Sequence, residues 1–386
     1  MHNIMAVAMN STGSHMILSN EGGHVLYINT STETVIFKFR ANRTVRAVQF
    51  SPNGKLIAIC RDMDLQIQEI GKQTISMYYP FHLSKTYKLS SETLNCVDWS
   101  SDGCLVVAGG EDHIVRVVGS RDYRNLFIHP LASHQGAIVT CQFINNNYDL
   151  ISVCKRGIAN VWTASIQPGD LVEGKWTKPD ENEMESEDEA VTRLYYDKTK
   201  RYSLLESSGS GKSGIDVTSC RIHTKTNILV TAYSNGVFVL HEVPSFSLIH
   251  NLRVSDMQIT SVAINNTGDW LALGCGKGSA AQLVVWEWQS ETYVLKQQAH
   301  SQRILAVQYS PDGSLMGTGA EDGKGQVAVV ETVTLYASVG GGWTLVSMDH
   351  PSRLPFFFWL SYSPAPFNCM RLAPKKSLRK VSSTDE

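Results

Sequence analysis

A unit of four short apolar stretches separated by turn residues repeats along this chain, and its clearest copy spans residues 259–298. The third stretch of that copy ends in Trp286 and Trp288. The pattern restarts at Ile304, about 45 residues after it began, which is the spacing of β-propeller blades. Four short strands joined by tight turns form one antiparallel sheet. Because residues two apart in a strand point the same way, we expect Trp286 in the core and Trp288 on the same face.

The opening of this unit, an apolar strand followed by a polar turn, occurs seven times. We predict seven inner strands, at residues 5–9, 45–50, 94–99, 138–143, 217–222, 259–264 and 304–309. One large all-β domain can accommodate a chain of 386 residues. The predicted fold class is therefore an all-β propeller of about seven blades of four antiparallel strands over residues 1–335, followed by an irregular, poorly ordered tail over residues 336–386.

The copies share a small set of marker residues. A Ser-Pro-Asn/Asp-Gly turn occurs at 51–54 and 310–313, and a Glu-Asp corner at 111–112 and 321–322. A Val-Trp pair occurs at 161–162 and 285–286, and a histidine at 134 and 300. These markers resemble the signature of the WD-repeat family of β-propellers. More narrowly, the runs 235–244, 270–274 and 283–298 are similar to those of nucleolar WD-repeat scaffolds of the small-subunit processome. The similarity covers roughly residues 4–324.

The resemblance implies a non-enzymatic scaffold in ribosome biogenesis, a component of the small-subunit processome or a small nucleolar RNP that supports pre-rRNA processing and 40S assembly in the nucleolus. Its implied partners are other WD-repeat processome proteins in a preassembled subcomplex, together with pre-rRNA and a guide small nucleolar RNP. We expect no membrane partner and no small-molecule substrate. The alternative is a WD-repeat adaptor for a ubiquitin ligase or a trafficking coat, and an enzymatic propeller is a third hypothesis.

Members of the resembled family carry another blade of sequence before the first predicted strand, and the resemblance ends after Lys324. We therefore expect a fragment without one native blade at its start and without everything after the start of the seventh blade. A propeller ring normally closes by pairing strands from the two chain ends. Here closure would need a third strand at 326–330 and a fourth from 332–339, so we predict that closure is the weak point.

The polar network typical of the repeat is incomplete in this chain. In the usual unit a corner Asp bonds to a His and a Ser/Thr and so satisfies polar groups buried between blades. In the third copy Asp112 keeps the corner, but Gly110 replaces the hydroxyl and Val118 replaces the tryptophan. In the fourth copy Arg156 takes the corner, while His134 and the tryptophan remain. Apolar packing must therefore hold much of the ring together.

Residues 167–201 interrupt the repeat. The run at 180–189 carries seven carboxylates, a composition typical of a solvated, disordered loop. Two functional alternatives are an acidic bait for a basic protein tail and a tether regulated by phosphorylation at Ser186. The resemblance adds that the family also carries an acidic insertion at this place.

No catalytic, cofactor-binding or metal site is predicted. The net charge of −2 gives no global basic excess. The eight cysteines show no Cys-x-x-Cys spacing, so we expect free thiols in a reducing compartment. The Gly-Lys-Ser at 211–213 is not a phosphate loop, because Glu206 stands where the motif needs a glycine. The histidines and aspartates that a catalytic site would need fall on repeat positions, where a structural role is favoured: His134, His300, Asp112 and Asp322.

Overall fold

The structure is a computed structural model of the 386-residue chain. It describes residues 2–32, 34–71, 80–144, 146–174, 193–205, 214–298, 300–333, 338–339, 342–343 and 354–362. None of these residues is helical, so this part of the chain contains no helix that could span a membrane.

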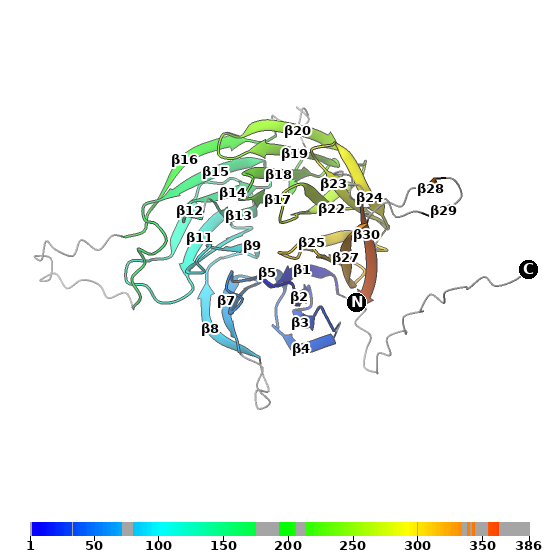
Figure 1. Ribbon diagram of the computed structural model, residues 1–386. Helices are drawn as coiled ribbons and strands as arrows, with labels where there is room; N and C mark the ends of the chain where they lie inside the picture. The colour runs from blue at the N-terminus through cyan, green and yellow to red at the C-terminus, as the bar shows by residue number, and fades with distance from the viewer. Residues whose placement is uncertain are drawn as a thin grey trace, which may run out of the picture.

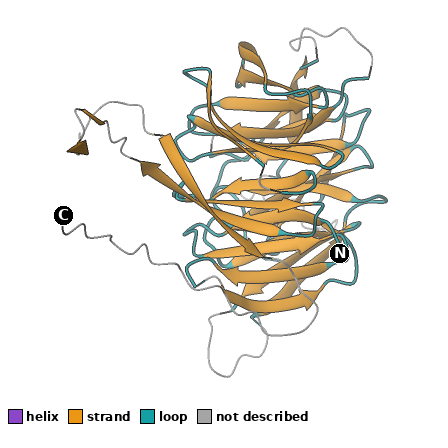
Figure 2. Ribbon diagram, turned by 90° about the vertical axis from the view of Figure 1, so that its right-hand side faces the viewer, coloured by secondary structure: helices purple, strands orange, loops and turns teal. Residues whose placement is uncertain are grey.

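Seven four-stranded antiparallel sheets stand around a central axis as the blades of a propeller (Figure 1). Figure 2 shows the same blades from the side, with the loops gathered at the strand ends. The first blade contains β1 (Ile4–Met9), β2 (His15–Asn20), β3 (His24–Asn29) and β4 (Thr34–Arg40), and the second contains β5 (Val45–Phe50), β6 (Leu56–Arg61), β7 (Asp64–Ile70) and β8 (Phe81–Lys88). The third contains β9 (Leu94–Trp99), β10 (Leu105–Gly110), β11 (Ile114–Gly119) and β12 (His129–Ala132), and the fourth contains β13 (Ile138–Phe143), β14 (Leu150–Cys154), β15 (Ile158–Ala164) and β16 (Tyr196–Ser203).

The fifth blade contains β17 (Val217–His223), β18 (Ile228–Tyr233), β19 (Val237–Glu242) and β20 (Ser247–Arg253), and the sixth contains β21 (Gln258–Ile264), β22 (Trp270–Lys277), β23 (Ala280–Glu287) and β24 (Thr292–Gln297). The seventh contains β25 (Ile304–Tyr309), β26 (Leu315–Ala320), β27 (Gly325–Val333) and β30 (Leu354–Tyr362), and a separate pair is formed by β28 (Ser338–Val339) and β29 (Gly342–Trp343). The seven predicted inner strands are confirmed as β1, β5, β9, β13, β17, β21 and β25.

The turn between the first two strands of a blade shows why the repeat folds as it does. In the second blade the amide of Gly54 donates to the carbonyl of Ser51, and the Ser51 hydroxyl donates to the carbonyl of Leu56. Gly54 has φ 68°, a left-handed conformation that costs glycine no Cβ clash. The Ser-x-x-Gly sequence therefore reverses the chain so that the apolar second strand pairs with the inner strand.

Apolar side chains fill every seam between neighbouring blades. Seven clusters of buried residues bridge the seven seams, including the closing seam, where Ile4, Val7 and Leu18 of the first blade pack with Leu315 and Val327 of the seventh. Trp286 is buried in the seam between the fifth and sixth blades, and Trp288 packs against the same cluster just after the strand ends, as predicted. The core is thus distributed around the ring.

Ring closure differs from the expectation. Each blade is built from strands that follow one another in the chain, and no described strand pairs the two chain ends in one sheet. The fourth strand of the last blade is β30, inside the predicted irregular tail, and not a segment of 332–339. The reason is length: β27 extends through Val333, so residues 332 and 333 already belong to the third strand, and the apolar run of β30 matches its nine residues.

The insertion is also shorter than predicted. Residues 196–201, assigned to the disordered loop, belong to β16, the outer strand of the fourth blade. Five of the eight residues of β16 are exposed and none is buried, so its sequence shows no apolar alternation from which a strand could be recognised. At the base of the insertion, the buried side chain of Asn125 bonds the carbonyl of Asp170 and the amide of Val172. The acidic run at 180–189 lies outside the described residues.

Candidate interaction site at the central channel

The seven inner strands surround the propeller axis (Figure 1), and residues of all seven line a channel there. We call the end where these strands begin the upper channel, a cavity of about 240 Å³. The end where they finish is the lower channel, a cavity of about 200 Å³. Both cavities have more polar than apolar surface, so they suit a charged or hydrogen-bonding group better than an apolar one.

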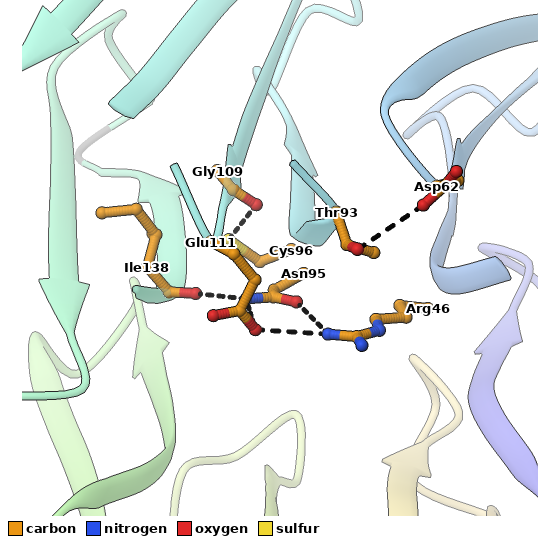
Figure 3. Close-up of polar contacts among 8 residues, drawn as sticks. All are labelled: Arg46, Asp62, Thr93, Asn95, Cys96, Gly109, Glu111 and Ile138. Atoms are coloured by element: carbon orange, nitrogen blue, oxygen red, sulfur yellow. Dashed lines mark hydrogen bonds and ion pairs between the residues drawn. The ribbon is translucent and has the colours of Figure 1, made fainter. Parts of the chain in front are cut away.

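A polar cluster stands at the mouth of the upper channel (Figure 3). The Arg46 guanidinium donates to Asn95 Oδ1 at 2.9 Å and to Glu111 Oε1 at 3.2 Å, and Asn95 Nδ2 donates to Glu111 at 3.1 Å. Asn95 Nδ2 also donates to the carbonyl of Ile138, the first residue of β13, at 3.2 Å. The cluster therefore joins the second, third and fourth blades.

The ion pair in this cluster positions its side chains more than it stabilises the fold. The side chains of Arg46 and Glu111 are 37% and 41% exposed, and exposed ion pairs contribute about 0–1 kcal/mol. Asn95 is bonded to both partners, as Figure 3 shows. The mouth of the channel thus presents a fixed set of donors and acceptors to whatever approaches from that face.

Around the channel, polar side chains of one inner strand accept hydrogen bonds from backbone amides of the next. The pairs are Asp98 with Phe143 at 3.0 Å, Gln142 with Ile222 at 2.8 Å, Ser219 with Val262 at 3.1 Å and Ser261 with Val307 at 3.0 Å. These bonds run from the third blade to the seventh. They supply between-blade polar contacts that the incomplete repeat network lacks.

Asp98 is the enclosed carboxylate of this region. Gln49 Nε2 donates to its Oδ1 at 3.0 Å, and the amide of Phe143 donates to its Oδ2. Burial raises the pKa of Asp98 to about 6, although these hydrogen bonds and the charge of Arg221 act in the opposite direction. The free-energy cost of removing water from the ionised carboxylate is larger than the stabilisation that its hydrogen bonds and Arg221 provide.

The two repeat histidines lie before the fourth and seventh blades, and each is hydrogen-bonded to side chains of the blade that follows it. His300 Nε2 lies 2.9 Å from Thr318 Oγ1, and its Nδ1 lies 3.2 Å from Asp322 Oδ2. His134 Nε2 lies 2.7 Å from the Ser152 hydroxyl, which also accepts from Trp162 Nε1 at 2.9 Å.

Both buried histidines are held neutral. Burial is the largest cause that lowers the pKa of both rings, and it takes the pKa of His134 to about 4. Nearby Asp322 acts in the opposite direction on His300. A neutral imidazole enclosed by repeat side chains is what a structural role predicts.

The third and fifth blades depart further from the pattern. Asp112 pairs with Arg116 at 2.6 Å and not with a histidine. In the third blade the hydroxyl position is occupied by Ala108, not by Gly110. In the fourth blade the hydroxyl residue Ser152 stands two residues after Leu150, which lies opposite Trp162. In the third blade Val106 lies opposite Val118, so the equivalent position two residues later is Ala108.

In the fifth blade His241 takes the tryptophan position, opposite Leu229. It is 1% exposed, neither ring nitrogen has a partner among the described residues, and burial lowers its pKa to about 4. Counting residues from the turns of the repeat could have shown, from the sequence alone, that His241 occupies the tryptophan position. The Arg46 cluster and Asp98 gave no such signal, because their partners lie on other blades.

No group of three or more His, Cys, Asp or Glu side chains in the described part of the chain could hold a metal ion. The seven cysteines described there are free, and six of them are buried.

Comparison with known proteins agrees with the propeller. The family described as WD domain, G-beta repeat matches residues 33–67, 82–118 and 291–327. The chain is 57% identical to the periodic tryptophan protein 2 homolog of Caenorhabditis elegans over 93% of this chain and 39% of that protein. The identity is 34% to the homolog of Mus musculus, over 84% of this chain and 37% of that protein, and 29% to periodic tryptophan protein 2 of Saccharomyces cerevisiae, over 83% and 34%. The chain spans less than half the length of each of these relatives.

Proposed function

Because this chain belongs to the periodic tryptophan protein 2 family of WD-repeat proteins, we propose that it is a non-enzymatic scaffold in ribosome biogenesis. Its role is to hold components of the small-subunit processome together during pre-rRNA processing and 40S assembly in the nucleolus. The proposed partners are other WD-repeat processome proteins in a preassembled subcomplex, with pre-rRNA and a guide small nucleolar RNP. No membrane and no small-molecule substrate enters this role.

The observation that carries the proposal is 57% identity over 93% of the chain, together with the narrower sequence resemblance to nucleolar scaffolds. The geometry is compatible with it, because a ring of seven blades presents loops on two faces and loops carry binding function. The polar cluster at the mouth of the upper channel lies on one of these two faces.

The test is affinity purification of the tagged chain from cells, followed by identification of the proteins and RNA that copurify. Enrichment of WD-repeat processome proteins, pre-rRNA and a guide small nucleolar RNA supports the proposal. Enrichment of ubiquitin-ligase subunits or coat proteins without pre-rRNA contradicts it and favours the adaptor alternative.

A paired set of variants assigns the contacting face. Replacing both Arg46 and Glu111 by Ala removes the ion pair at the channel mouth, while the apolar clusters between blades remain. Replacing both Arg253 and Asp256 by Ala removes an exposed ion pair on the fifth blade and is the matched control. Loss of partners from the first variant alone places their contact at the channel mouth.

A further inference from the structure

In the part of the chain that the structure describes, the Arg, Lys, His, Asp and Glu side chains that line the channel are all basic. Among the described residues that line its two cavities there are two arginines, Arg46 and Arg221, and one histidine, His223, but no Asp or Glu. Arg46 is paired with Glu111, and His223 is bonded to Thr226 and to the carbonyl of Asn266. Arg221 lines both cavities, is exposed to them, and forms no ion pair within the described part of the chain.

Two carboxamides share the lower channel with Arg221. Gln142, on β13, uses its side-chain oxygen to accept the amide of Ile222, which leaves its NH₂ group available. The side chain of Gln308, on β25, forms no hydrogen bond with another described residue. One guanidinium and two amide groups therefore reach the same cavity from three strands. Guanidinium and amide N–H groups together form a donor set suited to an oxyanion.

Asp98 interacts electrostatically with Arg221, although it does not line either cavity. Its carboxylate already accepts from Gln49 and from the amide of Phe143, and burial raises its pKa. Asp98 forms no ion pair with Arg221 in the described part of the chain, so it compensates the guanidinium charge only in part. A cavity with basic lining and protein walls concentrates the field on an anion that enters it.

We propose that the lower channel binds one oxyanion group, a carboxylate or a phosphate, through the Arg221 guanidinium, with Gln142 and Gln308 as further donors. The cavity of about 200 Å³ is large enough for either group with water around it, since a single water occupies roughly 10–15 Å³ on this scale. The site is independent of the proposed role in ribosome assembly, because it rests on the channel lining alone.

The test measures binding of inorganic phosphate and of acetate to the purified whole chain by isothermal calorimetry, at constant ionic strength set with chloride. Wild type is expected to bind at least one of them, and the preference between them identifies the source class. Arg221→Gln should weaken that binding about tenfold or more, because it removes a charge-assisted donor. Gln308→Leu should weaken it several-fold without any change in net charge.

Arg253→Gln is the matched control, because it removes one positive charge from the outer strand of the same blade. It should bind like wild type. The proposal is overturned if wild type binds neither anion, if Arg221→Gln binds as wild type does, or if the Arg253 control loses as much affinity. Thermal unfolding checks that each variant is folded, and if Arg221→Gln is not, the Gln308 variant decides.

Discussion

His241 is the position at which the incomplete repeat network should be most visible in solution. The ring occupies the tryptophan position of the fifth blade, is 1% exposed, and offers two nitrogens without partners among the described residues. His241→Phe keeps an aromatic ring and removes both polar atoms. A buried polar group without a partner costs about 1–3 kcal/mol, so the variant should unfold with a free energy about 1–3 kcal/mol higher than wild type at pH 8.

The stability advantage of His241→Phe over wild type should be larger at acidic pH. Burial lowers the pKa of folded His241 to about 4, whereas an unfolded histidine titrates near its ordinary value of 6.5. A depressed histidine pKa costs stability as the pH falls below 6.5, because the unfolded chain then binds a proton that the folded chain does not. At pH 5 this cost is about 2 kcal/mol, and the phenylalanine variant does not bear it.

Urea denaturation followed by circular dichroism at pH 8 and pH 5 measures both effects. His134→Phe is the matched control, because that ring is bonded to Ser152 and Asn160 and its loss should destabilise the fold at pH 8. The reasoning is refuted if His241→Phe is less stable than wild type at pH 8, or if its advantage does not increase at pH 5.

Three further predictions concern the core, the channel and the insertion. Trp286→Ala should cost about 3–5 kcal/mol in urea denaturation, because the side chain fills a seam between blades, and a near-neutral result would contradict its buried position. Asp98→Asn should gain stability relative to wild type between pH 4 and pH 8, by at most about 3 kcal/mol, because the raised carboxyl pKa means that ionised Asp98 destabilises the fold above pH 6. If the difference in unfolding free energy between Asp98→Asn and wild type does not change over that pH range, this prediction is wrong. Deletion of 180–189 should shift the thermal midpoint by only a few degrees, because such a sequence buries too little apolar surface to offset ordering, about 1–2 kcal/mol per residue, and collapse of the fold would show otherwise.

The inner strands could be predicted almost to the residue because each is apolar and ends at a turn that requires glycine or asparagine. The 45–50, 94–99 and 138–143 predictions coincide with β5, β9 and β13. β16 could not be predicted in the same way, since an outer strand that faces solvent needs no apolar alternation. β30 was assigned to the tail because its pairing with β27 spans residues distant in sequence.

The channel chemistry was not visible in the sequence for a related reason. Arg46, Asn95 and Glu111 come from two blades and meet only when the ring forms. The marker residues gave the structural histidines correctly, because His134 and His300 bond within their own repeats. The hydroxyl position of the third blade was misplaced by two residues, since only the strand register shows that Ala108 occupies it.

Amide hydrogen exchange tests most directly whether seven blades form a closed ring held by apolar packing between their faces. The inner strands β1 to β25 should all exchange slowly, and the closing seam between β1 and β25 should open first, because the first and seventh blades, unlike the other neighbouring pairs, are not consecutive in the chain. Slow exchange in β5 to β21 with faster but still protected exchange in β1 and β25 is the predicted result. Exchange of β1 and β25 at the rate of an unstructured peptide would contradict a closed ring.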